Sequence, residues 1–408
     1  MEILEAKLAV IEAGKQLVKC GLIARTWGNV SCRVSDTHFV ITPSGREYNA
    51  LTPDDIVLVS IADCTYDGDV KPSSEKGIHA SCYRLRPNCN FVIHTHQLYA
   101  SMAGLAGLDI QVKDENSAAI LGTSVPAAAY GLPGTGKLKQ GVSDAIARSD
   151  ANAALMLHHG AVCLGTDMEN AFCVAQELEN VCKASLLARY EHVTGNAADS
   201  FTSLSEYIAQ TLKKADDIKM PEYPAFLSER EGETILMTPR DGGDSVRIRL
   251  CDGTPLDSSA LYPSSAEMHL AVYNKRDDIN CIIHNKQEDV VAVSSIGKTV
   301  KPFLDDFAQI VGVTARNAAF NPNDGKKTAK RVVKKLNGRN AVLLKDNGAL
   351  CAGSDMSDAQ AVEMVAEKGC QSFVAANILD KGNKTIKGYE CVLMRVVYKL
   401  KYSKQASK

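Results

Sequence analysis

An internal repeat constrains the fold of this chain more than any other feature. Residues 152–168, "NAALMLHHGAVCLGTDM", return at residues 340–356 as "NAVLLKDNGALCAGSDM". Residues 78–94 and 268–284 form a second matching pair, in the same order along the chain. The period is far longer than that of a solenoid repeat, so the sequence predicts one domain fold that is used twice.

The length and composition agree with more than one domain. A chain of 408 residues, 45% hydrophobic and 23% charged, is typical of a soluble globular protein with two or three domains. Segment 213–226 is charged and then interrupted by prolines, which is the pattern of a domain boundary. We therefore expect a first domain at residues 1–215 and a second domain at residues 216–408.

Each copy of the repeat mixes strand patterns with helix patterns. The segments "HFVITPSG" and "DIVLVSIA" have the apolar periodicity of strands, and "FVIHTH" and "AALMLHHGAVCLG" are typical of buried strands. The segment "SEKGIHASCYRLRP" has helical spacing after a serine cap, and residues 169–191 form a long amphipathic pattern. The sequence predicts an α/β fold in which helices cover a sheet.

Charge and cysteine content limit the setting and the partners. The formal net charge of -2 gives no general attraction to nucleic acid or to an anionic membrane, so neither is expected as a partner. The 13 cysteines are scattered and include no Cys-x-x-Cys pair, which is typical of reduced thiols. Because no signal peptide or membrane-spanning run is visible either, a cytoplasmic location is predicted.

His94 and His96 are the first candidates for a metal site. Alternate side chains of a strand share a face, so the His-x-His spacing places two imidazoles side by side. Neutral imidazole binds zinc and the neighbouring transition metals. His158 or His159, at the end of another apolar run, could add a third nitrogen, and Glu75 could be a fourth ligand. Such a set predicts an open site of the catalytic type.

The second copy has lost this set of ligands. His284 is kept, but Lys286, Asn347 and Ser265 stand at the other matching positions. One histidine cannot hold a zinc ion, so we predict that the second copy binds no metal. Its role is expected to be architectural.

His79 follows a different pattern from the candidate ligands. Its counterpart, His269, persists in the copy that has lost the rest of the set. We interpret a histidine that is common to both copies as a structural residue.

Turns rich in small residues offer a site for an anion. Ser73 and Ser74 precede a helix, whose free N–H groups and dipole favour negative charge. The turns at residues 26–31 and 42–46 add hydroxyls and backbone donors that could hold a phosphate. The segment "GLPGTGKL" is not interpreted as a P-loop, because Leu138 stands where a magnesium-binding Ser or Thr is required.

Several of these motifs together resemble the class II aldolase/adducin family. They are "GNVS", "ITPSG", "KPSSE" with a histidine four residues after the glutamate, "IHTH" and "HHG", in that order. The resemblance covers essentially all of the first copy, and the second copy resembles the same fold in degenerate form. It implies two copies of a three-layer α/β/α domain with a central, largely antiparallel sheet.

The resemblance also implies a metal and a set of site residues. His94, His96 and His159 match the three imidazole ligands of a zinc ion, with Mn²⁺ or Co²⁺ as alternatives. Glu75 matches the acid that binds the metal and acts as the base once substrate displaces it. The phosphate-binding positions of the family match Thr26, Asn29, Ser44, Gly45, Ser73 and Ser74.

The implied reaction is the cleavage of a carbon–carbon bond in a small phosphorylated ketose, through a metal-stabilised enediolate. The aldolases of the family use a tyrosine from a neighbouring subunit, but residues 112–126 contain none, and Asp114 and Glu115 are the available acids. A sugar-phosphate 4-epimerase and a sugar-acid phosphate decarboxylase therefore remain alternatives. A non-catalytic, adducin-like assembly protein is the alternative outside the enzymes; the intact ligand set of the first copy favours the enzyme.

An assembly is implied as well. Enzymes of this family form fourfold rings, so two chains with tandem domains would form a pseudo-fourfold ring in which catalytic and degenerate domains alternate. The expected partners are a small sugar phosphate and further copies of this chain, as a dimer or a larger homo-oligomer.

Overall fold

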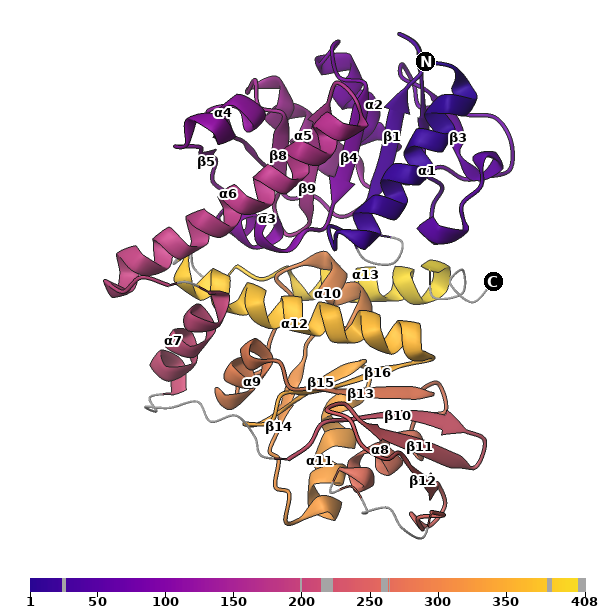
Figure 1. The fold of residues 1–408 in the computed structure, drawn as a ribbon, viewed down its shortest axis with the longest axis vertical. Coiled ribbons are helices and arrows are strands. Elements are labelled where there is room, and N and C mark those ends of the chain that lie inside the picture. The colour runs from indigo at the N-terminus through magenta and orange to yellow at the C-terminus, as the bar shows by residue number, and fades with distance from the viewer. Residues whose placement is uncertain are drawn as a thin grey trace. The chain divides into compact units, whose positions relative to one another are not determined.

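The computed structural model divides the chain into two compact units, Met1–His192 with Val397–Lys408, and Val193–Val396 (Figure 1). The predicted domain boundary at residues 215 and 216 lies outside the described residues. Helix α7 (Phe201–Lys213) belongs to the second unit, because it packs against α9 and α12 of that unit. The described residues are 1–23, 27–198, 200–213, 223–257, 263, 265–379 and 384–402.

A seven-stranded sheet forms the centre of the first unit, within the residues that are described, in the order β3-β2-β1-β4-β9-β8-β7. Every neighbouring pair is antiparallel except β7 and β8, which are parallel. A separate small sheet pairs β5 with β6. The strands are β1 (Asn29–Arg33), β2 (His38–Ile41), β3 (Val57–Ser60), β4 (Phe91–Thr95), β5 (Ile110–Gln111), β6 (Ser124–Val125), β7 (Ala127–Ala128), β8 (Ala153–Met156) and β9 (Gly160–Gly165).

Helices cover both faces of this sheet because its strands are apolar on both sides (Figure 1). In β4, Phe91 and Ile93 pack into the core on the side of α1 and α6, whereas Val92 packs on the side of α2 and α5. The alternation of side chains directs His94 to the same side as Val92. The helices of the unit are α1 (Ile3–Lys19), α2 (Lys76–Leu85), α3 (Leu98–Ala103), α4 (Glu115–Leu121), α5 (Gly136–Ala147) and α6 (Met168–Thr194), with 3-10 turns at Tyr48–Ala50, Pro53–Asp55 and Gly104–Ala106.

The described part of the second unit repeats this architecture, with a sheet in the order β12-β11-β10-β13-β16-β15-β14. Again one pair, β14 with β15, is parallel and the others are antiparallel. The matching order confirms that one three-layer α/β/α fold with a largely antiparallel sheet is used twice. The strands are β10 (Phe226–Glu231), β11 (Thr234–Pro239), β12 (Val246–Arg249), β13 (Cys281–Asn285), β14 (Arg316–Ala318), β15 (Ala341–Leu344) and β16 (Ala349–Gly353).

The helices of the second unit again lie on both sides of its sheet. Those on one side, α8 and α11, share a core with the strands, and α12 packs on β13, β15 and β16. Among the described residues, no helix has the length and apolar character that crossing a membrane requires. The helices are α8 (Ala266–Tyr273), α9 (Glu288–Ser295), α10 (Asp305–Ile310), α11 (Gly325–Leu336), α12 (Met356–Ile378) and α13 (Gly388–Val397). The π-helical turn at Tyr398–Tyr402 that follows α13 belongs to the first unit.

Candidate active site

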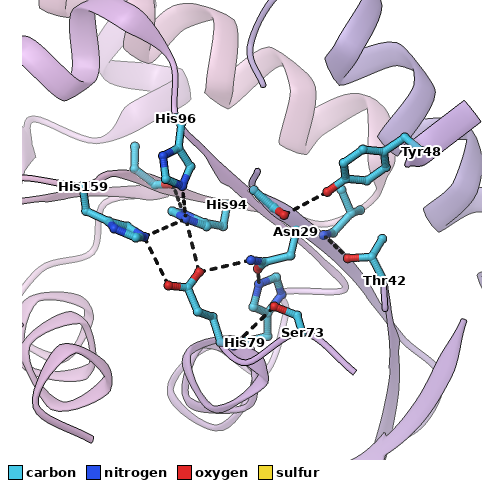
Figure 2. A network of polar contacts seen from close by, with 12 residues as sticks. Asn29, Thr42, Tyr48, Ser73, His79, His94, His96 and His159 are labelled. Atoms are coloured by element: carbon cyan, nitrogen blue, oxygen red, sulfur yellow. Dashed lines mark hydrogen bonds and ion pairs between the residues drawn. The ribbon is translucent and has the colours of Figure 1, made fainter. Parts of the chain in front are cut away.

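Strand β4 and the residue after it carry the His-x-His pair of the first unit. The backbone carbonyl of Ala161, on the neighbouring strand β9, lies 2.9 Å from Nδ1 of His94. A carbonyl can only accept, so Nδ1 carries the hydrogen and Nε2 presents its lone pair. Nε2 of His96 lies 3.1 Å from Nε2 of His94, and the two rings turn towards each other (Figure 2). This tautomer is the one that a metal ligand requires.

The turn between β8 and β9 brings the third imidazole to the pair. Nε2 of His159 lies 3.0 Å from Nε2 of His94, and both side chains are buried. His158 points elsewhere, with its ring edge-on to Tyr130 at 5.2 Å between centroids. Its φ of 63° is the left-handed conformation that lets the chain turn directly before β9. The structure therefore brings His159, and not His158, to the histidine pair.

Glu75 completes the cluster from the N-terminus of α2. Its Oε2 lies 3.3 Å from Nε2 of His94 and its Oε1 lies 3.2 Å from Nε2 of His159, and the side chain is 8% exposed. Burial alone raises the pKa of Glu75, but its electrostatic interactions with the His94 and His159 rings and hydrogen bonds from His159 and Asn29 outweigh it. The net effect holds the pKa of Glu75 well below its usual range, so its carboxyl group is ionised at neutral pH.

This donor set fits a divalent transition metal. His94, His96 and His159 offer ligand atoms that lie within 4.8 Å of one another, and no other such group is found among the described residues. Zinc–nitrogen bonds of about 2.0–2.1 Å in a tetrahedral site separate neighbouring ligand atoms by about 3.3 Å. The nitrogen–nitrogen and nitrogen–oxygen distances of 3.0 to 3.3 Å in the cluster are close to that separation. Three imidazoles with one carboxylate also suit zinc and its neighbours chemically.

The predicted phosphate-binding residues that are described include Ser73 and Ser74, which directly precede Glu75, and Ser44 and Gly45 in an adjoining turn. An isolated bridge between Pro43 and Pro72 joins the two turns that hold them. Ser73 is buried and accepts a hydrogen bond from the amide of Glu75 at 3.2 Å, whereas Ser74 is exposed. Ser44 and Gly45 are half-buried in the adjoining turn, and the amide of Ser44 donates to the carbonyl of Lys71 at 2.9 Å. Thr26 lies outside the described residues, and the phosphate-binding role of the whole set stays a prediction.

Asp114 and Glu115 are not brought to the histidines of their own chain. Asp114 caps α4, where its carboxylate accepts from the amide of Ser117 at 2.9 Å and from its hydroxyl at 3.1 Å. These hydrogen bonds lower the pKa of Asp114 from its usual value. Glu115 is exposed in the first turn of the same helix. Neither acid contacts the cluster within the described residues, and a catalytic role for either one stays a prediction.

Comparison with known proteins identifies the family. Residues 8–186 and 236–374 match the sequence model of the family described as Class II Aldolase and Adducin N-terminal domain. The chain belongs to the class II aldolase/adducin family. The two matched segments confirm the predicted tandem arrangement.

Named relatives of the chain are aldolases. The chain is 32% identical over 171 residues to the 5-deoxy-D-ribulose 1-phosphate aldolase of Bacillus thuringiensis serovar kurstaki, over 42% of this chain and 79% of that protein. It is 32% identical over 206 residues to the L-fuculose phosphate aldolase of Escherichia coli K12, over 50% of this chain and 91% of that protein. A solved structure of L-fuculose 1-phosphate aldolase covers 46% of this chain and 87% of its own, with 29% identity and a TM-score of 0.43. This family member is an enzyme of the aldolase type, as the sequence predicts.

Two features of this aldolase-family site were missed by sequence reasoning. Gly28, with a φ of 77°, lies so close to β4 that an added Cβ would be 2.5 Å from the carbonyl oxygen of His94. Tyr48 donates from its hydroxyl to the carbonyl of Gly28 at 2.9 Å (Figure 2). The "GN" pair of "GNVS" is the only sequence signal for this close approach. The close approach of Gly28 to β4 places Asn29 beside Glu75, where the Asn29 amide donates to Oε2 at 3.1 Å.

The matching position in the second aldolase-like unit has different contacts. Nε2 of His284 lies 2.7 Å from the backbone carbonyl of Asn347, so this nitrogen donates rather than presenting a lone pair. Lys286, at the position of the second histidine, donates to the carbonyl of Tyr223. That the second copy binds no metal stays a prediction.

Proposed function

We propose that the first unit cleaves a carbon–carbon bond in a small phosphorylated ketose with the help of a divalent metal, for which zinc is the first candidate. One observation carries the proposal: Nε2 of His94 lies 3.0 to 3.3 Å from Nε2 of His96, Nε2 of His159 and a carboxyl oxygen of Glu75, and the three histidine ligand atoms lie within 4.8 Å of one another. The metal, when bound by His94, His96 and His159, supplies a Lewis acid that stabilises the negative charge left on the ketose fragment. The two named relatives are aldolases of sugar phosphates, which supports a phosphorylated ketose as the substrate.

Glu75 is proposed as the group that moves the proton. Its carboxyl group is largely shielded from water and lies 3.2 to 3.3 Å from two of the proposed ligands, so it is placed to accept or return a proton next to the substrate carbonyl. The hydroxyls of Ser44, Ser73 and Ser74, together with the backbone at Gly45, are proposed to hold the phosphate. Their position around Glu75 supports this role, because it would fix the ketose carbon within reach of the carboxylate.

The second unit is proposed to bind no metal and to act as a scaffold. Within an assembly of two or more chains it would pack against the first unit of a neighbouring chain, so that a neighbour completes the pocket. Asp114 and Glu115 are proposed to act on the aldehyde side only in such an assembly, because they do not contact the cluster of their own chain.

Metal analysis tests the first part of the proposal. The purified protein should hold about one zinc ion per chain after loading, and His94→Ala should remove it. His284→Ala, the matched change in the second unit, should leave the metal content unchanged. A protein that takes up no divalent metal would contradict the proposal, and so would metal that is lost with His284→Ala.

Activity tests the second part. Ketose 1-phosphates and pentulose 5-phosphates should be screened with zinc-loaded protein, and the products identified by mass. Aldehyde release together with a triose phosphate supports the lyase, whereas isomeric or decarboxylated products would assign the alternatives. Glu75→Gln should lower kcat by about 10²–10⁴, the usual contribution of a general acid–base group. Full activity of this variant would refute the role of Glu75.

A further inference from the structure

A line of buried hydrogen bonds leads to Glu75. The amide nitrogen of Asn29 lies 3.1 Å from Oε2 of Glu75 and donates to it, because an amide nitrogen carries the hydrogens and a carboxyl oxygen accepts. The amide oxygen of Asn29 then faces the other way. It contacts Nε2 of His79, a residue of helix α2 (Figure 2).

The tautomer of His79 follows from this contact. An amide oxygen accepts, so Nε2 of His79 carries the hydrogen. Burial lowers the pKa of His79 to about 3, so the ring is neutral and its Nδ1 has a free lone pair. Ser31 lies 2.6 Å from this Nδ1 and must donate to it. Tyr83, 2.6 Å from the Ser31 oxygen, then donates to Ser31. Every donor in the line points towards Glu75.

The second unit provides an internal comparison. It keeps the first half of the line, at 2.9 Å between the tyrosine and serine oxygens and 2.7 Å between serine and Nδ1 of histidine. Phe226 replaces the asparagine and Ser265 replaces the glutamate. Nε2 of His269 is buried and has no hydrogen-bond partner among the described residues. The residues of the shared half are Ser228, His269 and Tyr273.

The comparison separates two roles of this histidine. The contact through Nδ1 is present in both units and belongs to the fold. The contact through Nε2 exists only in the first unit, where the line continues to Asn29 and Glu75. The second unit keeps its architecture without an Nε2 contact. The Nε2 contact of His79 is therefore not needed to form the three layers.

We propose that His79 is a positioning residue for the reaction. By donating to the amide oxygen of Asn29, it prevents this amide from turning over, and the Asn29 N–H then holds the Glu75 carboxylate in one orientation. A reversed amide would place its oxygen against the carboxylate, and the two acceptors would repel each other. His79 does not touch the metal-ligand atoms or the reacting atoms. The inference rests on the proposed proton-transfer role of Glu75.

Steady-state kinetics of His79→Phe test the proposal, with His269→Phe as the matched control in the second unit. Each change removes the same serine contact from one unit. Without His79 the Asn29 amide can turn over and lose its hydrogen bond to the Glu75 carboxylate, which is expected to lower kcat about 10- to 100-fold for His79→Phe. KM and metal content should stay near those of the wild type, and His269→Phe should keep its kcat. His79→Gln, which retains an N–H donor, should recover part of the loss.

Ser31→Ala keeps the test decisive if His79→Phe does not fold. Without Ser31, the Nδ1 lone pair loses its donor and the Nε2–H tautomer is held by the Asn29 contact alone, so kcat should again fall while Ser228→Ala leaves it unchanged. A folded His79→Phe or Ser31→Ala enzyme with the wild-type kcat would overturn the proposal. A loss of kcat that comes with loss of metal would overturn it too. Full activity in Glu75→Gln would instead show that the proposed function is wrong.

Discussion

Replacement of Gly160 by alanine tests whether the turn between β8 and β9 sets the geometry of the histidine cluster. An added Cβ would lie 2.1 Å from the carbonyl oxygen of Thr95 and 3.3 Å from Cα of His96. Contacts of real Cβ atoms do not fall below 3.0 Å, so the start of β9 or the end of β4 must move. The required shift is roughly 1 Å. It separates His159 from His96, because His159 directly precedes Gly160 and His96 directly follows Thr95.

The expected effect on the site is larger than the effect on stability. Overpacking of this kind costs about 1–3 kcal/mol of the free energy of unfolding. A ligand constellation tolerates only about 0.5 Å of displacement, and a misplacement of 1 Å can cost about 100-fold in rate. Gly160→Ala should therefore lower both metal content and kcat strongly while the protein still folds.

Gly348 offers a control with the same geometry in the second unit. An added Cβ there would lie 2.1 Å from the carbonyl oxygen of Asn285 and 3.3 Å from Cα of Lys286. Its φ of 82° adds about 1–2 kcal/mol of backbone strain for alanine. Gly348→Ala should thus destabilise the chain at least as much, yet leave metal content and kcat unchanged.

The assay combines metal content after equal loading, kcat at a temperature where both variants are folded, and denaturant unfolding. The reasoning is refuted if Gly160→Ala keeps the metal and kcat of the wild type. It is also refuted if Gly348→Ala loses both to the same extent.

Three further outcomes are expected. Burial lowers the pKa of His79 and His269 to about 3 and that of His284 to about 4, below the ordinary 6.5. Below pH 6.5 the unfolded chain therefore binds more protons than the folded chain. As the pH is lowered from 6.5 to 4, the free energy of unfolding should fall by about 1.4 kcal/mol per pH unit for each histidine. Denaturation curves that do not change across this window would contradict this prediction. Lys368→Met should destabilise the second unit by about 3–5 kcal/mol, because it leaves the buried Asp306, now 2.9 Å from the lysine nitrogen, without its cation; a thermal scan with an unchanged midpoint would argue against it. Removal of metal by a chelator should lower the melting temperature of the wild type but not that of His94→Ala, as calorimetry can check.

Local patterns in the sequence were sufficient to predict two copies of an α/β fold in which helices cover a sheet, and the family resemblance added the three layers and the largely antiparallel sheet. The repeat implied two copies of one fold, and the apolar runs around His94 and before His159 implied buried strands; both are confirmed. The reason is that periodicity depends on which faces of a strand or helix are buried, and each residue reports its own burial. The His-x-His spacing also placed His94 and His96 on one side of β4 without any knowledge of distant residues.

Contacts between distant residues were decided by the tertiary structure. His159 rather than His158 reaches the cluster because of the antiparallel register of β4 with β9 and the left-handed φ of His158. Together they direct the His159 side chain towards His94. The link from His79 through Asn29 to Glu75 was likewise hidden, and His79 alone suggested only a structural role. Strand β1 and helix α2 are separate in the sequence, and only the packing of the helix on the sheet brings their polar groups within hydrogen-bonding distance. Spacing along the chain determines which face a side chain occupies, whereas register and packing determine which partner it meets.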